Sequence, residues 1–540
     1  MGILKAFSKN DPDKYLKLAS EYYNSRNFSS ALEHYNKCIE GNPSAAALYG
    51  RGLTLYHMGK YHECISDFKA VLELNPAFTK NIYLHYALAS FHTGEKVSAV
   101  KYLDLFLAEN PTDVNAFYYR AVIKEELNNL AGALLDYESA LHLDPDMTKS
   151  LLGAGTIKYK LKDYKKSIID LNRAISINPN YPEAYNIRGL AYSEIENYTA
   201  AFQDFCKAME LDQNNYDACY NAGNLKNKTG DFADAVQFLN SAIKIDPANP
   251  RAYRLRAEIK LKLEELVDAE DDYSKLIELN AEDDAALLER GRIKISLFDY
   301  NGAKEDFKRA MEINSSDAEV YYNTGLLMIS IKEDAEAIKC FNKAIELNPA
   351  HIEAYLSRGQ LLHASQKLNE ASADFSKAVE LNPENHIAYY HRGNTKAALS
   401  DHYGAIADYT KALANPGYIE AYIGRGTSKS ALNDHYGALN DFSKAISLEP
   451  KNYLHYFYRA TAHKSMGGFD DALDDLNKSI TLNTQFAKAY FLRGVIFHNL
   501  RNYRNAIKDW EMAIKIDISY SDQLKPLIQE AGNKSLNIKR

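Results

Sequence analysis

The stretch IEAYLSRGQLLHASQKLNEASADFSKAVELNP, residues 352–383, decides the fold of this chain. It predicts two short amphipathic helices joined by a turn, because apolar and small residues recur at helical spacing in each half. The first half carries Tyr355 and Gly359, and the second carries Phe375. The second helix is expected to stop at Pro383, since proline cannot continue a helix.

The same pattern returns along nearly the whole chain with a period of 34 residues, and a fixed period of this size is the signature of a repeat architecture. Most steps are of 34 residues, and the exceptions are of 33 or 35. The period is traced by a small residue near the middle of each first helix: Ala19, Gly52, Ala87, Ala121, Gly155, Gly189, Gly223, Ala257, Gly291, Gly325, Gly359, Gly393, Gly426, Ala460 and Gly494.

A second small residue follows twelve positions after the first, and a large apolar residue follows four positions after that. In the quoted stretch these are Ala371 and Phe375. Small residues let two helix backbones approach closely, and the large side chain one turn later fills the space beside them. The spacing therefore predicts that the two helices of each repeat pack tightly against each other.

This pattern resembles the tetratricopeptide repeat family, and the resemblance covers about residues 12–518, fifteen repeats in all. It implies an all-α fold, a right-handed superhelical α-solenoid of antiparallel helix pairs. It also implies that the first helices of the repeats line a concave groove.

The chain is expected to have no separate globular domain, since no break in period or composition divides it. The residues after 518 place apolar side chains on one face, which predicts a helix that caps the last repeat, and Pro526 is expected to keep that helix short. The expected divisions are an N-terminal lead-in at 1–11, the repeats at 12–518, a C-terminal capping helix at 519–531 and a disordered tail at 532–540.

Composition excludes several classes of partner and site. The net charge is −8 with a pI near 6.1, which gives no reason to expect nucleic acid as a ligand. No apolar run is long enough for a membrane span, and the N-terminus does not match a secretory signal, so we expect a cytoplasmic protein. The five cysteines are scattered without metal-site spacing, and we expect neither a metal nor a cofactor.

An arginine stands one residue before the small residue in ten repeats, and an aspartate follows that arginine by sixteen residues in each of them. Four other repeats have lost both charges, which indicates direct pairing across the two helices. In most members of the tetratricopeptide repeat family the arginine's position is apolar, so this chain departs from the usual pattern of the family that it resembles. The expected structural ion pairs include Arg51 and Asp67, Arg120 and Asp136, Arg188 and Asp204, Arg358 and Asp374, and Arg392 and Asp408.

These arginines have two interpretations. They could line the groove for an acidic ligand, or they could form ion pairs within each repeat. We favour the ion pairs, which fix helix register more than they add stability, because desolvation offsets much of the attraction. Asp170 stands opposite Ala154 and lacks its arginine, so it should find another donor or face water.

Aromatic and amide residues are frequent where the resemblance places the groove. Tyrosine offers apolar area and a hydroxyl group at low entropic cost, which suits peptide binding. Packing between repeats is an equally good interpretation for any single one of them. The candidate partner-binding residues are Tyr49, Tyr56, Phe91, Tyr118, Tyr220, Asn224, Tyr322, Tyr390 and Asn394.

The predicted function is a non-enzymatic scaffold or adaptor that binds a protein or peptide segment in the groove. The sequence has no catalytic motif such as a nucleophile elbow or a phosphate-binding glycine loop, and the repeats leave no room for an enzyme domain. The alternative is a substrate-recruiting or regulatory subunit of an enzyme or chaperone complex. The groove lysine of chaperone-binding co-chaperones is absent from its place, and assembly into a homo-oligomer is left open.

Overall fold

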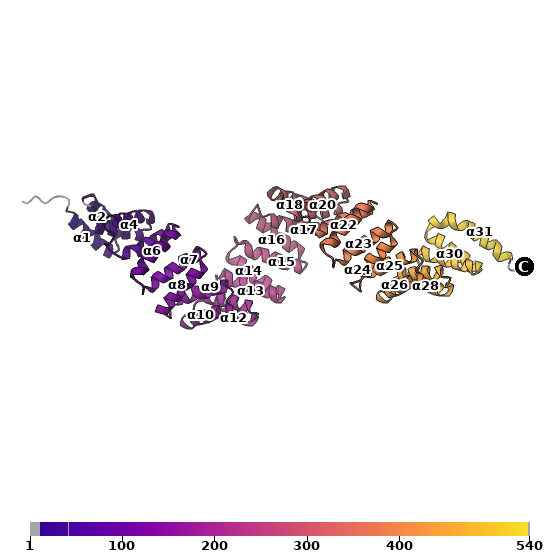
Figure 1. Ribbon diagram of the computed structural model, residues 1–540, viewed down its shortest axis with the longest axis horizontal. Coiled ribbons are helices and arrows are strands. Elements are labelled where there is room, and N and C mark those ends of the chain that lie inside the picture. Colours follow the sequence, from indigo (N-terminus) through magenta and orange to yellow (C-terminus); the bar gives the residue numbers. More distant parts are fainter. Residues whose placement is uncertain (1–10, 42, 538–540) are drawn as a thin grey trace, which may run out of the picture. The chain divides into compact units, whose positions relative to one another are not determined.

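The protein is described here by a computed structural model, which covers residues 11–41 and 43–537. In those residues helices are the only regular elements (Figure 1). The first helix begins at Pro12, and the side chain of Asp11 caps it by accepting a hydrogen bond from the backbone N–H of Asp13. The rest of the lead-in expected at residues 1–11 lies outside the described part of the chain.

The chain forms two compact units, Met1–Asp272 and Tyr273–Arg540, and the border falls inside α16. The helices up to that border are α1 (Pro12–Asn24), α2 (Phe28–Gly41), α3 (Ala45–His57), α4 (Tyr61–Leu74), α5 (Asn81–His92), α6 (Lys96–Glu109), α7 (Val114–Glu126), α8 (Leu130–Leu143), α9 (Thr148–Lys160), α10 (Tyr164–Ile177), α11 (Pro182–Glu194), α12 (Tyr198–Leu211), α13 (Tyr216–Thr229), α14 (Phe232–Ile245), α15 (Pro250–Lys262) and α16 (Leu266–Leu279).

The second unit continues the series. Its helices are α17 (Asp284–Ser296), α18 (Tyr300–Ile313), α19 (Ala318–Ser330), α20 (Asp334–Leu347), α21 (Ile352–Ala364), α22 (Leu368–Leu381), α23 (His386–Ala398), α24 (His402–Ala412), α25 (Ile419–Ala431), α26 (His435–Leu448), α27 (Tyr453–Ser465), α28 (Phe469–Leu482), α29 (Ala487–Asn499), α30 (Tyr503–Ile516), the short 3-10 helix η1 (Ile518–Tyr520) and α31 (Ser521–Asn537).

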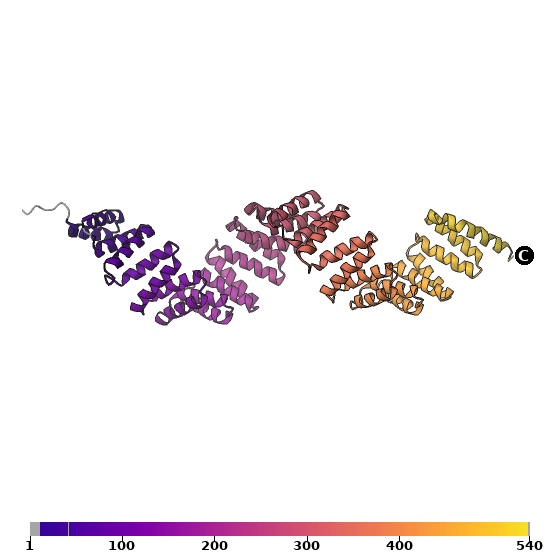
Figure 2. The same cartoon turned by 45° about the horizontal axis from the view of Figure 1, so that its top comes forward.

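Within each unit the helices pack as consecutive antiparallel pairs (Figure 2). The odd-numbered helices up to α29 are the first helices of the repeats, and the even-numbered helices are the second helices. In the described residues, every extensive contact joins helices that are one or two places apart in the chain. Each unit is therefore a stack of neighbours, an α-solenoid, as the 34-residue period predicts.

Each repeat is held together where its small residues meet a large side chain. A Cβ atom added to Gly325 would lie 2.4 Å from Cε1 of Phe341, which is closer than real atoms approach. Phe341 and the second small residue, Ala337, are both fully buried. The close helix approach predicted from the spacing is therefore confirmed, and Gly325 cannot carry a side chain because the ring of Phe341 occupies that place.

The turn between the two helices of a repeat passes through one residue with a left-handed φ. In eleven of the fifteen repeats this residue is not glycine. An L-residue in this region loses roughly 1–2 kcal/mol, so these turns are held by the helices that they join. The non-glycine residues are Arg26, Asn128, Lys162, Glu196, Glu264, Phe298, Lys332, Gln366, Ser400, Asn433 and Arg501.

Most repeats end in a turn that an asparagine or aspartate side chain closes. Asn382 follows α22, and its side-chain oxygen accepts a hydrogen bond from the backbone N–H of Glu384 at 3.0 Å. This local bond satisfies a backbone donor while the chain reverses toward the next helix. The Asn-Pro signal therefore acts through the asparagine as well as through the proline.

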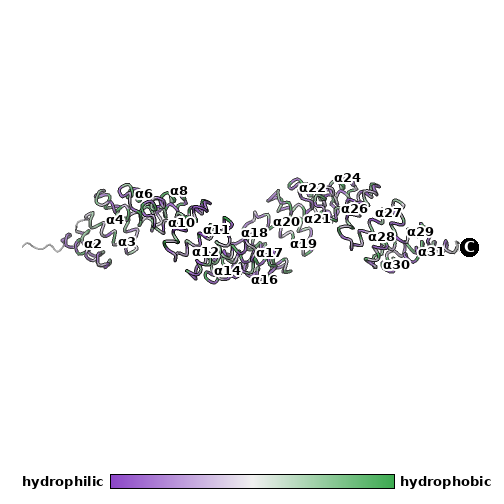
Figure 3. The backbone as a smooth tube through the Cα atoms, turned by 90° about the horizontal axis from the view of Figure 1, so that it is seen from below, coloured by the Kyte–Doolittle hydropathy of each residue, from purple (hydrophilic) through white to green (hydrophobic). Residues whose placement is uncertain are grey.

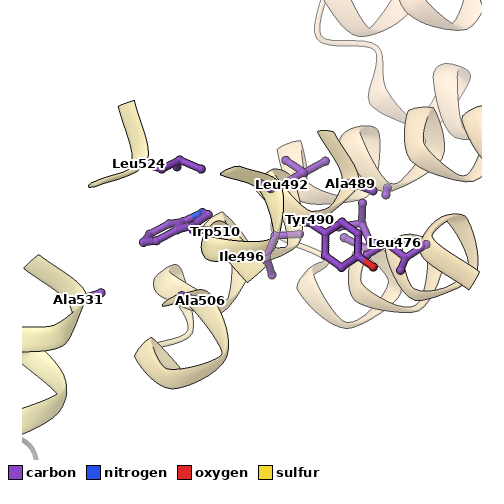
Figure 4. Packing of buried hydrophobic residues seen from close by; sticks show 13 residues of the cluster. Leu476, Ala489, Tyr490, Leu492, Ile496, Ala506, Trp510, Leu524 and Ala531 are labelled. Atoms are coloured by element: carbon purple, nitrogen blue, oxygen red, sulfur yellow. The ribbon is translucent and has the colours of Figure 1, made fainter. Parts of the chain in front are cut away.

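The last repeat is covered by α31, which packs on the single tryptophan of the chain (Figure 4). Trp510 is 1% exposed, and Leu524 and Ala531 of α31 are fully buried beside it. The expected short helix ending at residue 531 is wrong, since α31 continues to Asn537. Pro526 lies inside the helix, where its missing N–H removes one backbone hydrogen bond, and the buried side chains of Leu524 and Ala531 hold the helix on both sides of it. Of the tail expected at 532–540, residues 538–540 lie outside the described residues.

Hydrophilic and hydrophobic residues alternate along the helices of the chain (Figure 3). Among the residues that the structure covers, no helix combines the length and the apolar character that crossing a membrane requires.

The left-handed turns lead to a prediction for Gln366. Gln366→Gly should raise the thermal midpoint, because glycine adopts this φ without steric strain, and a gain of roughly 1 kcal/mol is expected. Gln366→Ala is the matched control, since alanine keeps the strained backbone and should leave the midpoint nearly unchanged. Thermal unfolding followed by circular dichroism compares the two, and equal effects of both substitutions would exclude strain at this turn.

Candidate functional site

The structure places each of the ten arginines against the aspartate of its own repeat. In the eleventh repeat, Nε of Arg358 donates to Oδ2 of Asp374 at 2.8 Å, and Nη2 donates to Oδ1 at 2.6 Å. This two-pronged geometry recurs in all of them: Arg51–Asp67, Arg120–Asp136, Arg188–Asp204, Arg256–Asp272, Arg290–Asp306, Arg358–Asp374, Arg392–Asp408, Arg425–Asp441, Arg459–Asp475 and Arg493–Asp509.

The third nitrogen of each guanidinium group reaches the preceding repeat, which the sequence reasoning missed. Nη1 of Arg358 donates to the side-chain oxygen of Asn342 on α20 at 2.6 Å. Each arginine therefore joins three helices across two repeats. The acceptors, in chain order, are Asn36, Asp104, Asn172, Asn240, Ser274, Asn342, Ser376, Thr410, Ser443 and Asn477.

A signal for this contact is present in the sequence. The residue fifteen or sixteen positions before each of these arginines is always Asn, Asp, Ser or Thr. In the four later repeats that lack the arginine, the residue sixteen positions before its place is Ala70, Glu138, Cys206 or Lys308, and none of these is Asn, Asp, Ser or Thr.

A lysine one helical turn after the arginine contributes a further bond in five of these repeats. It lies 2.8–2.9 Å from the aspartate and belongs to the pairs Lys124–Asp136, Lys260–Asp272, Lys294–Asp306, Lys396–Asp408 and Lys429–Asp441. In the fifth repeat, which has no arginine, Lys158 binds Asp170 at 2.7 Å. Asp170 thus finds another donor.

These charged groups are largely withdrawn from solvent. The side chains of Arg358 and Asp374 are 20% and 7% exposed. Burial raises the pKa of the Asp204 carboxyl and outweighs the bonds from Arg188 that lower it. Desolvation therefore offsets much of the attraction within each ion pair. The buried arginine and aspartate side chains position the helices and are not free to bind a ligand.

The first helices form the side of the stack where successive repeats come closest. α9 contacts α11, α11 contacts α13, and α17 contacts α19, whereas no pair of second helices has comparable contact in the described residues. A stack whose first helices are closer together curves toward them. We define the inner face of each unit as the surface of its first helices that carries the candidate partner-binding residues.

Most of these candidates are half-buried between repeats. The hydroxyl of Tyr49 lies 3.2 Å from Nδ1 of His85 in the next repeat, and burial raises the pKa of Tyr49 to about 12. Burial also raises the pKa of Tyr118 and of Tyr322. The ring of Tyr220 lies under the guanidinium group of Arg251, 4.3 Å from its centroid. These tyrosines contribute to the joints between repeats.

Tyr56 and Phe91 are likewise partly buried, Tyr56 beside Tyr61 with 5.5 Å between ring centroids, whereas Asn224 is exposed. The nine candidates are spread over both units and do not gather at one place. Tyr390 and Asn394 line a common cavity.

That cavity lies on the inner face of the second unit and has a volume of about 340 Å3. Three consecutive first helices, α23, α25 and α27, form its walls together with the turn before α27. The residues that line it are Tyr390, Asn394, Ile419, Glu420, Ile423, Gly424, Glu449, Asn452, Leu454, His455 and Tyr458.

The base of the cavity is fixed by packing. Tyr409 of α24 donates its hydroxyl hydrogen to Oδ1 of Asn394 at 2.7 Å. Its ring fits under Gly424, where an added Cβ would lie 2.6 Å from the ring. The sequence did not single out Glu420, Glu449 or His455, because they meet only after three repeats have stacked.

The described residues give little support for a metal site or for a nucleophilic cysteine. No group of three or more potential metal ligands gathers there. The five cysteines are free, and burial raises the pKa of Cys64 to about 12, which disfavours the thiolate that a nucleophile requires.

Comparison with known proteins gives one consistent family. Family models of the tetratricopeptide repeat match residues 45–78, 155–195, 196–259, 285–317, 318–351, 359–400 and 459–520.

Similar individual proteins include "DnaJ homolog subfamily C member 7" of Mus musculus, 22% identical over 25% of this chain and 26% of that protein. "Hsp70-Hsp90 organizing protein 3" of Arabidopsis thaliana is 25% identical over 25% of this chain and 37% of that protein. The chain thus spans about a quarter of the first relative and just over a third of the second.

Among solved structures, the hetero-tetramer Cut9-Hcn1 matches at 14% identity and a TM-score of 0.35 over 96% of both chains. YrrB, a TPR protein with an unusual peptide-binding site, matches at 25% identity and a TM-score of 0.30 over 34% of this chain and 95% of its own.

The ion pairs lead to a prediction for Arg358 and Asp374. Arg358→Ala leaves a buried carboxylate unpaired and should cost roughly 3–5 kcal/mol. The double variant Arg358→Ala/Asp374→Phe should cost much less, because it copies the residues Ala222 and Phe238 that the seventh repeat has at these positions. Native-state hydrogen exchange of α21 and α22 measures both effects, and a double-mutant cycle without coupling would rule out the pairing.

Proposed function

The chain belongs to the tetratricopeptide repeat family, and we propose that it is a non-enzymatic scaffold that holds a segment of a partner protein along its inner face. The observation that carries the proposal is the cavity around Tyr390 and Asn394, a hollow built into the inner face by three consecutive repeats. Its walls belong to helices that the arginines and tyrosines hold in place. A surface that is already ordered loses little entropy when a partner binds.

The many half-buried tyrosines fit the same proposal. A partner segment that follows the first helices meets aromatic edges in successive repeats, and each adds a modest contact. Many weak contacts on a preformed surface suit the capture of an extended segment or of a helix. The cytoplasmic location expected from the sequence stays a prediction.

A second candidate is recruitment of a partner to an enzyme or chaperone complex. Its support is the partial similarity to the Hsp70-Hsp90 organizing protein and to the DnaJ homolog. The missing groove lysine argues against the mode of chaperone binding that uses this residue. Stable co-purification with a catalytic chain would favour this candidate over a simple scaffold.

Substitutions on the two faces test the proposal. A partner is first identified by pull-down with crosslinking mass spectrometry. Tyr220→Ala/Tyr390→Ala, with one change on the inner face of each unit, should then weaken its binding about tenfold or more, which corresponds to about 1.4 kcal/mol. Affinity is measured with the full chain, and circular dichroism should show unchanged helicity.

The matched control is Tyr403→Ala/Tyr436→Ala. These tyrosines lie on the second helices α24 and α26 and are 77% and 78% exposed. The control removes the same atoms from the opposite side of the repeats and should leave affinity unchanged. Loss of binding in the control, with normal binding of the inner-face variant, would assign the partner to the second helices instead.

A further inference from the structure

The cavity on the inner face of the second unit has an acidic character. Glu420 of α25 and Glu449 of the turn before α27 line it, and none of its lining residues is lysine or arginine. Both glutamates are exposed. The cavity therefore offers two carboxylates to whatever enters it.

One of these carboxylates is held in place. Nδ2 of Asn452 donates to Oε2 of Glu449 at 3.1 Å, while Oδ1 of Asn452 accepts from the backbone N–H of Leu454 at 3.1 Å. The asparagine thus connects the glutamate to the start of α27. A carboxylate fixed in this way loses less freedom when it accepts a bond from a ligand.

A buried histidine completes the wall. His455 is 5% exposed, its Nε2 lies 3.8 Å from Oε2 of Glu449, and its Nδ1 has no hydrogen-bond partner among the described residues. Burial lowers the pKa of His455 despite the nearby carboxylates. The imidazole is therefore neutral near pH 7 and does not repel a cation.

Two aromatic rings line the same cavity as the carboxylates. The ring of Tyr390 packs on Tyr418 with 5.0 Å between centroids, and the ring of Tyr458 stacks on Phe442 at 5.8 Å. Their positions are set by these contacts rather than by a ligand. An aromatic face next to a carboxylate attracts a cation, and most of all a planar guanidinium group, which can stack on the ring and bind the carboxylate with two bonds.

We propose that this cavity is an anchoring subsite for a basic side chain, arginine or lysine, of the partner segment that lies on the inner face. The inference rests on the proposed function, which supplies the segment, and it adds the chemistry that the segment must carry. The volume of about 340 Å3 accommodates a long side chain with its charged head between the two glutamates. The apolar stem would lie against Ile423 and Leu454.

Selection from a random peptide library tests the proposal without a known partner. The full-length chain is immobilised, and random twelve-residue peptides displayed on phage are selected on it. Some of the selected peptides should bind the unchanged chain but not the variant Tyr390→Ala. These peptides should share an arginine or a lysine at one position. The same selection on Glu420→Gln/Glu449→Gln should lose that preference, since the substitution removes charge and keeps shape.

The matched control is Glu346→Gln/Glu380→Gln, which removes the same charge from the second helices α20 and α22. There each glutamate binds a lysine three residues away, at 2.7 Å. This variant should select the same basic peptides as the unchanged chain. Circular dichroism checks that both variants keep their helicity.

Fluorescence anisotropy then measures the affinity of the chain for one selected peptide and for a version of that peptide with glutamine in place of the basic residue. The unchanged chain should bind the glutamine version about tenfold more weakly or worse, and Glu420→Gln/Glu449→Gln should bind both versions alike. Peptides that depend on Tyr390 but show no basic preference would overturn the subsite and leave the proposed function intact. A library that yields no peptide dependent on the inner face would overturn both.

Discussion

The arginine fork is the interaction that joins neighbouring helices in ten of the fifteen repeats, and the form of the inner face depends on it. Two of its nitrogens bind the aspartate of the same repeat, and the third binds a polar side chain of the repeat before it, as Arg358 does with Asp374 and Asn342. Apolar packing alone tolerates small rotations of one helix against another, but a planar group with three fixed acceptors does not. The fork therefore sets both the pairing inside a repeat and the step to its neighbour, at a modest net gain in stability because burial of the charges opposes it.

This constraint is what gives the inner face a definite form. A cavity built from three repeats keeps its shape only if the step between repeats is reproducible, and the cavity beside Tyr390 draws its lining from α23, α25 and α27. Arg392, Arg425 and Arg459 stand on those same helices and join each one to the helix before it. The side chains that position the helices and those that line the cavity are thus two separate sets on the same first helices.

Much of the fold could be predicted because every feature is repeated. The sequence predicts pairs such as Gly325 with Phe341 and Arg358 with Asp374, because their counterparts recur at the same spacing along the chain. Contacts that form only when the repeats are stacked could not be predicted from the sequence. The contact to Asn342 depends on which helix lies behind the arginine, and Glu420, Glu449 and His455 become neighbours only when three repeats are in place. The left-handed turns were also missed, because residues such as Phe298 or Lys162 give no sign of that backbone.

Hydrogen exchange after Arg358→Gln tests most directly whether the fork joins neighbouring repeats. If it does, amide exchange should quicken in α21 and α22 and also in α20 of the preceding repeat, because Asn342 loses its donor along with Asp374. The helix α18, one repeat further away, should keep its original rate. Faster exchange confined to α21 and α22, with α20 unchanged, would contradict the account and reduce the fork to a bond within a single repeat.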